Sequence, residues 1–89
     1  MIELKKCRDK IDALDRELLR LFEERMHIVK DVAGIKKANG IGIYDSSRET
    51  ELISAIKAMS EDGLSEYDKA LFEKIMELSK LYQSRCLEE

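Results

Sequence analysis

Apolar residues recur at alternating steps of three and four along the first 35 positions of the chain. The positions in this series are Leu4, Cys7, Ile11, Leu14, Leu18, Leu21, Arg25, Ile28, Val32 and Ile35. This spacing places all of them on one stripe of a helix. Arg25 holds the only charge on the stripe, at a place where the pattern calls for an apolar side chain.

The end of this helix is marked by glycine. Gly34 alone costs about 1 kcal/mol in a helix interior, which is too little to end so long a periodic run. Gly40, within the stretch NGIG, suits the left-handed conformation that commonly closes a helix. The pattern therefore predicts one helix from about residue 3 to Ala38.

Two shorter helices are predicted beyond it. The second begins near YDSSRE, where Ser46 and Glu49 have the spacing of a capping box, and it ends before Gly63. The third begins after Ser65, a predicted N-cap. The residues expected to face inward are Leu52, Ile53, Ile56 and Met59 on the second helix, and Leu71, Ile75, Leu78 and Tyr82 on the third.

The length of the first helix bears on the assembly. About 35 helical residues span about 52 Å, whereas a compact chain of this size has a diameter near 30 Å, from a radius of gyration of about 12 Å. The helix must project from its own chain, and its apolar stripe needs cover from another. We therefore predict an all-α fold with three helices per chain, one of them very long, in an intertwined homodimer. Residues 1–89 form a single domain.

Composition narrows the function classes. The chain has 39% charged residues, no proline and a net charge of −3, which is typical of amphipathic helices and unlike a general nucleic-acid binder. No apolar stretch is long enough for a membrane span and the N-terminus does not resemble a signal peptide, so a soluble, cytoplasmic protein is expected. Cys7 and Cys86 lack metal-ligand spacing and are expected to be reduced thiols.

Two cations on the long helix are candidates for binding an anion. Arg25 on the apolar stripe is costly unless partnered, and a structural ion pair or an anion ligand would each serve. Lys36 lies eleven residues later and returns to within about 20° of the same face, although it could instead lie along the helix surface or pair there with Glu24 or Asp31. Arg8 is about 25 Å away, so it could join Arg25 only from an antiparallel partner helix.

Two polar clusters on the shorter helices are further candidates. Asp45, Arg48 and Glu49 follow the i, i+3, i+4 spacing of one helix face, which capping and local ion pairs alone could explain. Ser79 and Gln83 form an i, i+4 pair on a partly apolar stripe, and such a pair is often only the edge of a buried face.

The ordered set of these residues resembles the short, all-helical chorismate mutases. The resemblance is carried by RDKIDALDRELLRLFEERM, then Lys36, then DSSRE, then SKLYQ, and it spans nearly the whole chain. It implies an intertwined dimer that rearranges chorismate to prephenate, on the route to phenylalanine and tyrosine. That reaction is unimolecular and needs no nucleophile, metal or cofactor, so none is expected.

The resemblance also implies roles for the candidate residues. Arg25, and Arg8 from the partner chain, would hold the two carboxylates of the substrate. Lys36 and Gln83 would donate hydrogen bonds to the ether oxygen, which gains charge in the transition state. The remaining substrate-binding residues implied are Asp45 and Glu49 at the ring hydroxyl, Ser79 at a carboxylate, and Arg48 nearby or through water.

Two other functions compete with this interpretation. An isochorismate pyruvate lyase of the same fold shares the Arg and Lys positions, but such lyases tend to lack the polar side chains found here at Glu49 and Ser79. A helical dimerisation or regulatory module without catalysis would need the apolar stripe and the caps, but not this set of polar residues.

Overall fold

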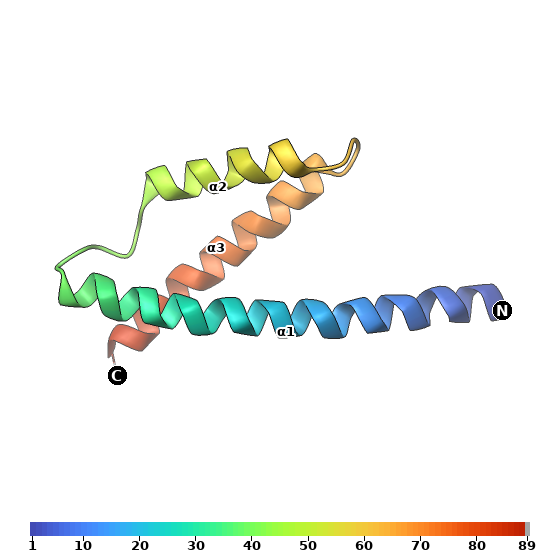
Figure 1. The fold of residues 1–89 in the computed structure, drawn as a ribbon, viewed down its shortest axis with the longest axis horizontal. Coiled ribbons are helices and arrows are strands. Elements are labelled where there is room, and N and C mark those ends of the chain that lie inside the picture. The colour runs from blue at the N-terminus through green and yellow to red at the C-terminus, as the bar shows by residue number, and fades with distance from the viewer. Residues whose placement is uncertain (89) are drawn as a thin grey trace.

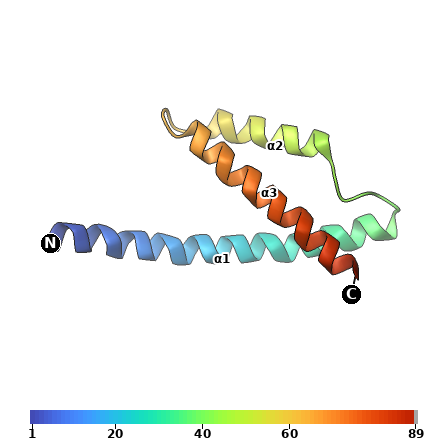
Figure 2. The ribbon, with the colours of Figure 1, turned by 180° about the vertical axis from the view of Figure 1, so that it is seen from behind.

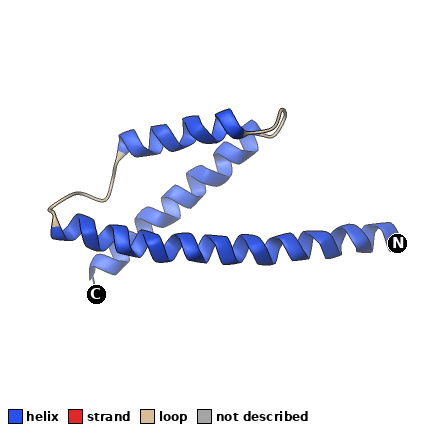
Figure 3. Ribbon diagram, viewed as in Figure 1, coloured by secondary structure: helices blue, strands red, loops and turns tan. Residues whose placement is uncertain are grey.

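The computed structural model describes residues 1–88, which form three helices and are 85% helical. They are α1 (Ile2–Ala38), α2 (Ser46–Met59) and α3 (Ser65–Glu88). No strand occurs among the described residues (Figure 3). None of these helices has an apolar stretch of the length that a membrane crossing requires. The all-α prediction and the three helices are confirmed.

Helix α1 ends at Ala38, as predicted from the position of Gly40. Gly40 has a positive φ of 65°, a conformation that glycine adopts without a Cβ penalty. The N–H of Ile41 donates to the carbonyl of Lys36 at 2.8 Å, and that of Gly40 donates to Lys37 at 3.3 Å. These two bonds form the Schellman arrangement and satisfy carbonyls at the end of the helix. The chain then leaves α1 and leads to the start of α2.

The starts of α2 and α3 differ from the predictions by one residue. Asp45, not Ser46, is the N-cap of α2, because its carboxylate accepts the backbone N–H of Arg48 at 3.0 Å. The capping box expected for Ser46 is therefore wrong, and Ser46 is the first helical residue. Ser65 likewise is the first residue of α3 rather than its cap. The predicted stop is confirmed, since α2 ends at Met59 and Gly63 has a φ of 86°.

Helix α3 makes the packing contacts that join the other two helices. It contacts both α1 and α2, while α1 and α2 do not pack directly on each other within residues 1–88. Figures 1 and 2 show α3 running from the turn after α2 to the C-terminal half of α1, which it crosses, with the N-terminal half of α1 projecting alone. The small buried core lies at the crossing and consists of Val29, Ala33, Met76, Ser79 and Gln83. The radius of gyration is 16.4 Å, well above that of a compact chain of this length.

The apolar stripe of α1 stays exposed over its whole length. Eight of its large side chains keep between 36% and 64% of their surface accessible: Leu4, Ile11, Leu14, Leu18, Leu21, Ile28, Val32 and Ile35. Helix α3 packs on the flank of the stripe, around Val29 and Ala33, and leaves the stripe itself uncovered. Single soluble chains rarely expose so continuous an apolar surface.

Two of the residues expected to face inward do not. Met59 is 73% exposed and Leu71 is 51% exposed. Met59 is the last residue of α2, beside the turn to α3. Leu71 lies about 140° around α3 from Met76, which faces the core. The face of α3 that is buried runs through Met76, Ser79 and Gln83 instead.

Candidate active site

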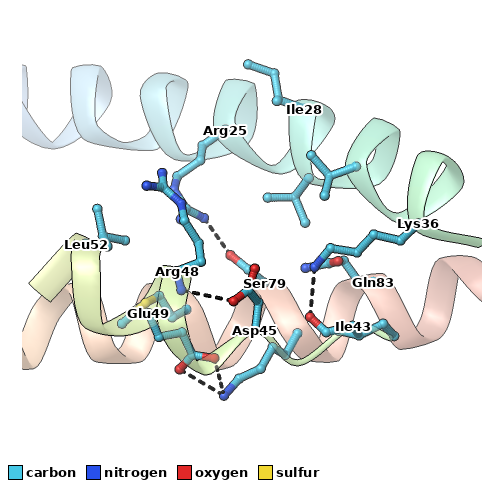
Figure 4. Close-up of a pocket in the computed structure, with 14 residues that line it drawn as sticks. Arg25, Ile28, Lys36, Ile43, Asp45, Arg48, Glu49, Leu52, Ser79 and Gln83 are labelled. Carbon is cyan, nitrogen blue, oxygen red and sulfur yellow. Dashed lines mark hydrogen bonds and ion pairs between the residues drawn. The ribbon is translucent and has the colours of Figure 1, made fainter. Parts of the chain in front are cut away.

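A cavity of about 290 Å³ opens where the three helices and the loop before α2 meet. Seven of the eight candidate residues line it: Arg25, Lys36, Asp45, Arg48, Glu49, Ser79 and Gln83. Apolar side chains, among them Val29, Leu52 and Met76, form much of the remaining wall. Helix α1 thus supplies Arg25 and Lys36, α3 supplies the serine and the glutamine, and the start of α2 supplies the polar cluster (Figure 4).

Arg25 is anchored by a hydroxyl and has no acidic partner in the part of the chain that the structure describes. Its Nη1 donates to Oγ of Ser79 at 2.6 Å, and that hydroxyl donates in turn to the carbonyl of Ile75 at 2.7 Å. No carboxylate among residues 1–88 pairs with the guanidinium, so the structural ion pair considered from the sequence is excluded within those residues. Burial, and next the positive charge of Arg48, lower the pKa of Arg25. An anion in the cavity would meet a cation that still lacks its counter-charge.

Lys36 and Gln83 lie at the other end of the cavity. The Nζ of Lys36 donates to the carbonyl of Ile43 at 2.9 Å, which ties the end of α1 to the loop before α2. Gln83 is only 7% exposed, and its Oε1 has no hydrogen-bond partner. Figure 4 shows both side chains reaching into the same part of the cavity. Hydrogen-bond donors from α1 and α3 thus converge there.

The start of α2 adds the polar cluster. The carboxylate of Asp45 is used in capping the helix, and Arg48 makes a loose, exposed ion pair with Glu51 at 3.9 Å. Glu49 is more enclosed and pairs with Lys80 of α3 at 3.2 Å. Lys80 could not be identified from the sequence, because nothing in the helical pattern links it to Glu49, 31 positions earlier.

The charges around the cavity favour an anionic ligand. Four cations and two carboxylates line it, which leaves a formal excess of two positive charges in a chain whose net charge is −3. Partial burial of Arg25 and Lys36 strengthens their attraction for a ligand charge, because the effective dielectric is lower than in water. The cavity therefore carries a local positive charge in a chain that is acidic as a whole.

Arg8 does not reach this cavity. It lies on the exposed N-terminal part of α1, 17 residues before Arg25, or about 25 Å along the helix. Within one chain the two residues stay apart, as the sequence predicted. Delivery of Arg8 by a partner chain remains a prediction.

The comparison with known families decides which family the chain belongs to. Residues 7–84 match the family described as chorismate mutase type II. The chain belongs to this family. The match covers most of all three helices and every candidate residue, including Arg8 in the projecting part of α1.

Individual relatives include two whose names contain chorismate mutase. The chorismate mutase of Methanocaldococcus jannaschii is 36% identical over 92 residues, covering 100% of this chain and 93% of that protein. The T-protein of Haemophilus influenzae is 39% identical over 61 residues, covering 68% of this chain but 16% of that protein. A bifunctional chorismate mutase/prephenate dehydratase of Aquifex aeolicus is 36% identical over 70% of this chain and 17% of that protein. The chain therefore spans about a sixth of the two longer relatives.

Proposed function

We propose that this chain catalyses the rearrangement of chorismate to prephenate, a step of aromatic amino acid biosynthesis. The observation that carries the proposal is Arg25, a half-buried guanidinium that pairs with no carboxylate among residues 1–88, in a cavity with excess positive charge. Chorismate is a dianion with two carboxylates, so it supplies the counter-charge that the chain itself does not.

Binding would select the reactive shape of the substrate. Arg25 holds one carboxylate with the help of Ser79, and Arg8 of a partner chain holds the other. Guanidinium and carboxylate form paired hydrogen bonds that fix orientation as well as position. Because the reaction joins two ends of one molecule, holding both carboxylates keeps the substrate in a compact conformer close to the transition state.

The chemical step would depend on donors at the ether oxygen. As the carbon–oxygen bond breaks, this oxygen gains negative charge, and Lys36 and Gln83 donate to it. Donors fixed in advance at such a position are each worth about 10²–10³ in rate. Glu49 and the backbone at Asp45 orient the ring hydroxyl, and Arg48 lies nearby or contacts the ligand through water.

The homodimer would complete both the core and the site. The uncovered stripe on α1 supports pairing of two such helices, since the stripe is apolar from Leu4 to Ile35 except at Arg25. An antiparallel arrangement places the N-terminal half of one α1 beside the C-terminal half of the other. Arg8 of each chain then comes near the cavity of its partner, and the chains intertwine.

The test is to incubate the purified protein with chorismate and to identify the products after separation. Prephenate formed in step with chorismate loss, at a rate well above buffer alone and unchanged by a metal chelator, is the expected result. Parallel incubation with isochorismate, with an assay for pyruvate, tests the lyase alternative. No reaction of either substrate would contradict the proposal and favour the dimerisation module.

A further inference from the structure

Lys80 joins three parts of the chain at the edge of the cavity. Its Nζ lies 3.2 Å from Oε2 and 3.3 Å from Oε1 of Glu49, so both carboxylate oxygens face one ammonium group. The same nitrogen lies 5.0 Å from the centre of the Tyr44 ring, within the range of a cation–π contact. The dashed lines at Glu49 in Figure 4 mark the ion pair.

This ion pair differs from the others in the chain. The Lys80 and Glu49 side chains are 36% and 27% exposed, whereas at least one side chain of every other pair within residues 1–88 is 59% exposed or more. It also joins α3 to the first turn of α2, while most of the other pairs lie within a single helix. Both partners line the cavity that holds Arg25.

We infer that Lys80 is a positioning residue for substrate binding, which holds the Glu49 carboxylate where it accepts a hydrogen bond from the ligand's hydroxyl. The inference rests on the proposed function. Lys80 acts through Glu49 and does not itself touch the ligand. Each carboxylate oxygen has two lone pairs, so both can face Lys80 and still accept from a hydroxyl.

The need for such a residue follows from the charges nearby. Glu49 shares the cavity with Arg25 and is adjacent in sequence to Arg48, and its side chain has several rotatable bonds. A free carboxylate would be drawn to these guanidinium groups, where it would compete with the carboxylates of the ligand. Lys80 gives Glu49 a cation of its own and leaves Arg25 available.

A purely structural role is the competing interpretation, in which the pair only fastens α2 to α3. The two roles differ in what they change. A fastening pair affects the stability of the fold, whereas a positioning residue affects the affinity for substrate, and only while Glu49 is present to be positioned.

The test is a double-mutant cycle with steady-state kinetics on chorismate. Lys80→Met keeps the aliphatic stem and removes the charge, and we expect KM to rise about tenfold with kcat within about twofold, as for loss of one charge-assisted hydrogen bond in binding. Lys80→Arg keeps the positive charge, so its KM should stay within about threefold of the wild-type value. In a Glu49→Gln background, Lys80→Met should change KM by less than about twofold. Lys74→Met is the matched control, because it removes the same charge from an exposed pair on α3, and KM should not change.

The outcomes separate this inference from the proposed function. An unchanged KM in Lys80→Met overturns the positioning role, whether or not the melting temperature changes. Additive effects of Lys80→Met and Glu49→Gln on KM overturn it as well. A wild-type protein that does not convert chorismate overturns the proposed function, and this inference with it.

Discussion

Arg25 and Ser79, 54 positions apart in the sequence, are joined by a hydrogen bond of 2.6 Å from the guanidinium to the hydroxyl. The bond lies where α3 crosses α1 and points the guanidinium into the cavity. It explains how a charge is accommodated beside an apolar stripe: one N–H group is satisfied by Ser79, and the others remain available to a ligand. In a structural ion pair, those N–H groups would instead donate to a carboxylate of the protein and would not be available to a ligand.

Replacing Arg25 by leucine should separate binding from folding. We expect kcat/KM for chorismate to fall at least about 100-fold, because the carboxylate loses its charged, paired donors. Burial lowers the pKa of Arg25, so the folded state binds this proton less tightly than the unfolded state. Stability therefore rises with pH only between the lowered and the ordinary pKa of arginine, and at pH values below that range the unfavourable contribution is constant. Leucine removes that contribution.

The melting temperature of Arg25→Leu should accordingly equal or exceed that of the wild type. Arg20→Leu is the matched control on the same helix, since Arg20 is exposed and pairs with Glu17 and Glu24. Its kcat/KM should match the wild type. Wild-type activity in Arg25→Leu would refute the role given to Arg25.

Replacing Ser79 by alanine tests the anchor of Arg25. The side chain is 5% exposed and its hydroxyl both accepts from Arg25 and donates to Ile75. We expect KM to rise about fivefold to tenfold through poorer placement of the guanidinium, with a loss of about 1 kcal/mol in stability. Steady-state kinetics and thermal unfolding measure both. Ser84→Ala, at an exposed position on the same helix, should change neither, and an equal effect at both serines would contradict the prediction.

The amide of Gln83 predicts how activity depends on pH. A carboxamide donates a hydrogen bond at any pH, so the wild-type rate should not climb as pH falls below neutral. Gln83→Glu should behave in the opposite way, because a carboxylate repels the ether oxygen and only the protonated acid can donate. Its kcat/KM should rise steadily as pH decreases, until another group limits it. A wild-type profile with the same acid dependence would show that Gln83 does not act at the ether oxygen.

The uncovered stripe on α1 predicts that assembly depends on its apolar side chains. Leu18, 59% exposed in the single chain, should be buried in the dimer. Leu18→Glu would place a charge there at a cost of several kcal/mol, enough to abolish a dimer at micromolar concentration or to unfold the chain. Sedimentation velocity and circular dichroism measure the two results. Arg16→Glu, about 200° around the helix from Leu18, should leave the dimer intact. An unaltered dimer in Leu18→Glu would mean that the stripe is not the interface.

Much of the fold could be predicted because it depends on local patterns. Alternating steps of three and four marked α1, and the left-handed Gly40 marked its end. The predicted helix starts differ from the observed ones by one residue. At α2, both Asp45 and Ser46 are suitable N-cap residues, and only the geometry of the folded chain decides between them. Helical periodicity alone did not fix which flank of α3 faces the core, so Leu71 was misplaced.

The site was harder to predict where it depends on contacts between distant positions. Arg25 could be found because it breaks a regular apolar series. Lys80 could not, because a lysine on a helix rich in charges is ordinary until Glu49 is seen beside it. Arg8 shows a different limit, since a single chain does not bring it to the cavity at all.

The most direct test of a site shared between two chains is therefore a complementation assay with two inactive variants, Arg8→Ala and Arg25→Ala. Each homodimer should be nearly inactive, because every site lacks one arginine. After the two proteins are unfolded together and refolded as a mixture, half of the dimers are mixed, and each mixed dimer has one intact site, so activity should return to about a quarter of the wild-type level. Recovery to that level would place Arg8 and Arg25 of one site on different chains. A refolded mixture that contains mixed dimers but stays as inactive as its parts would contradict a shared site.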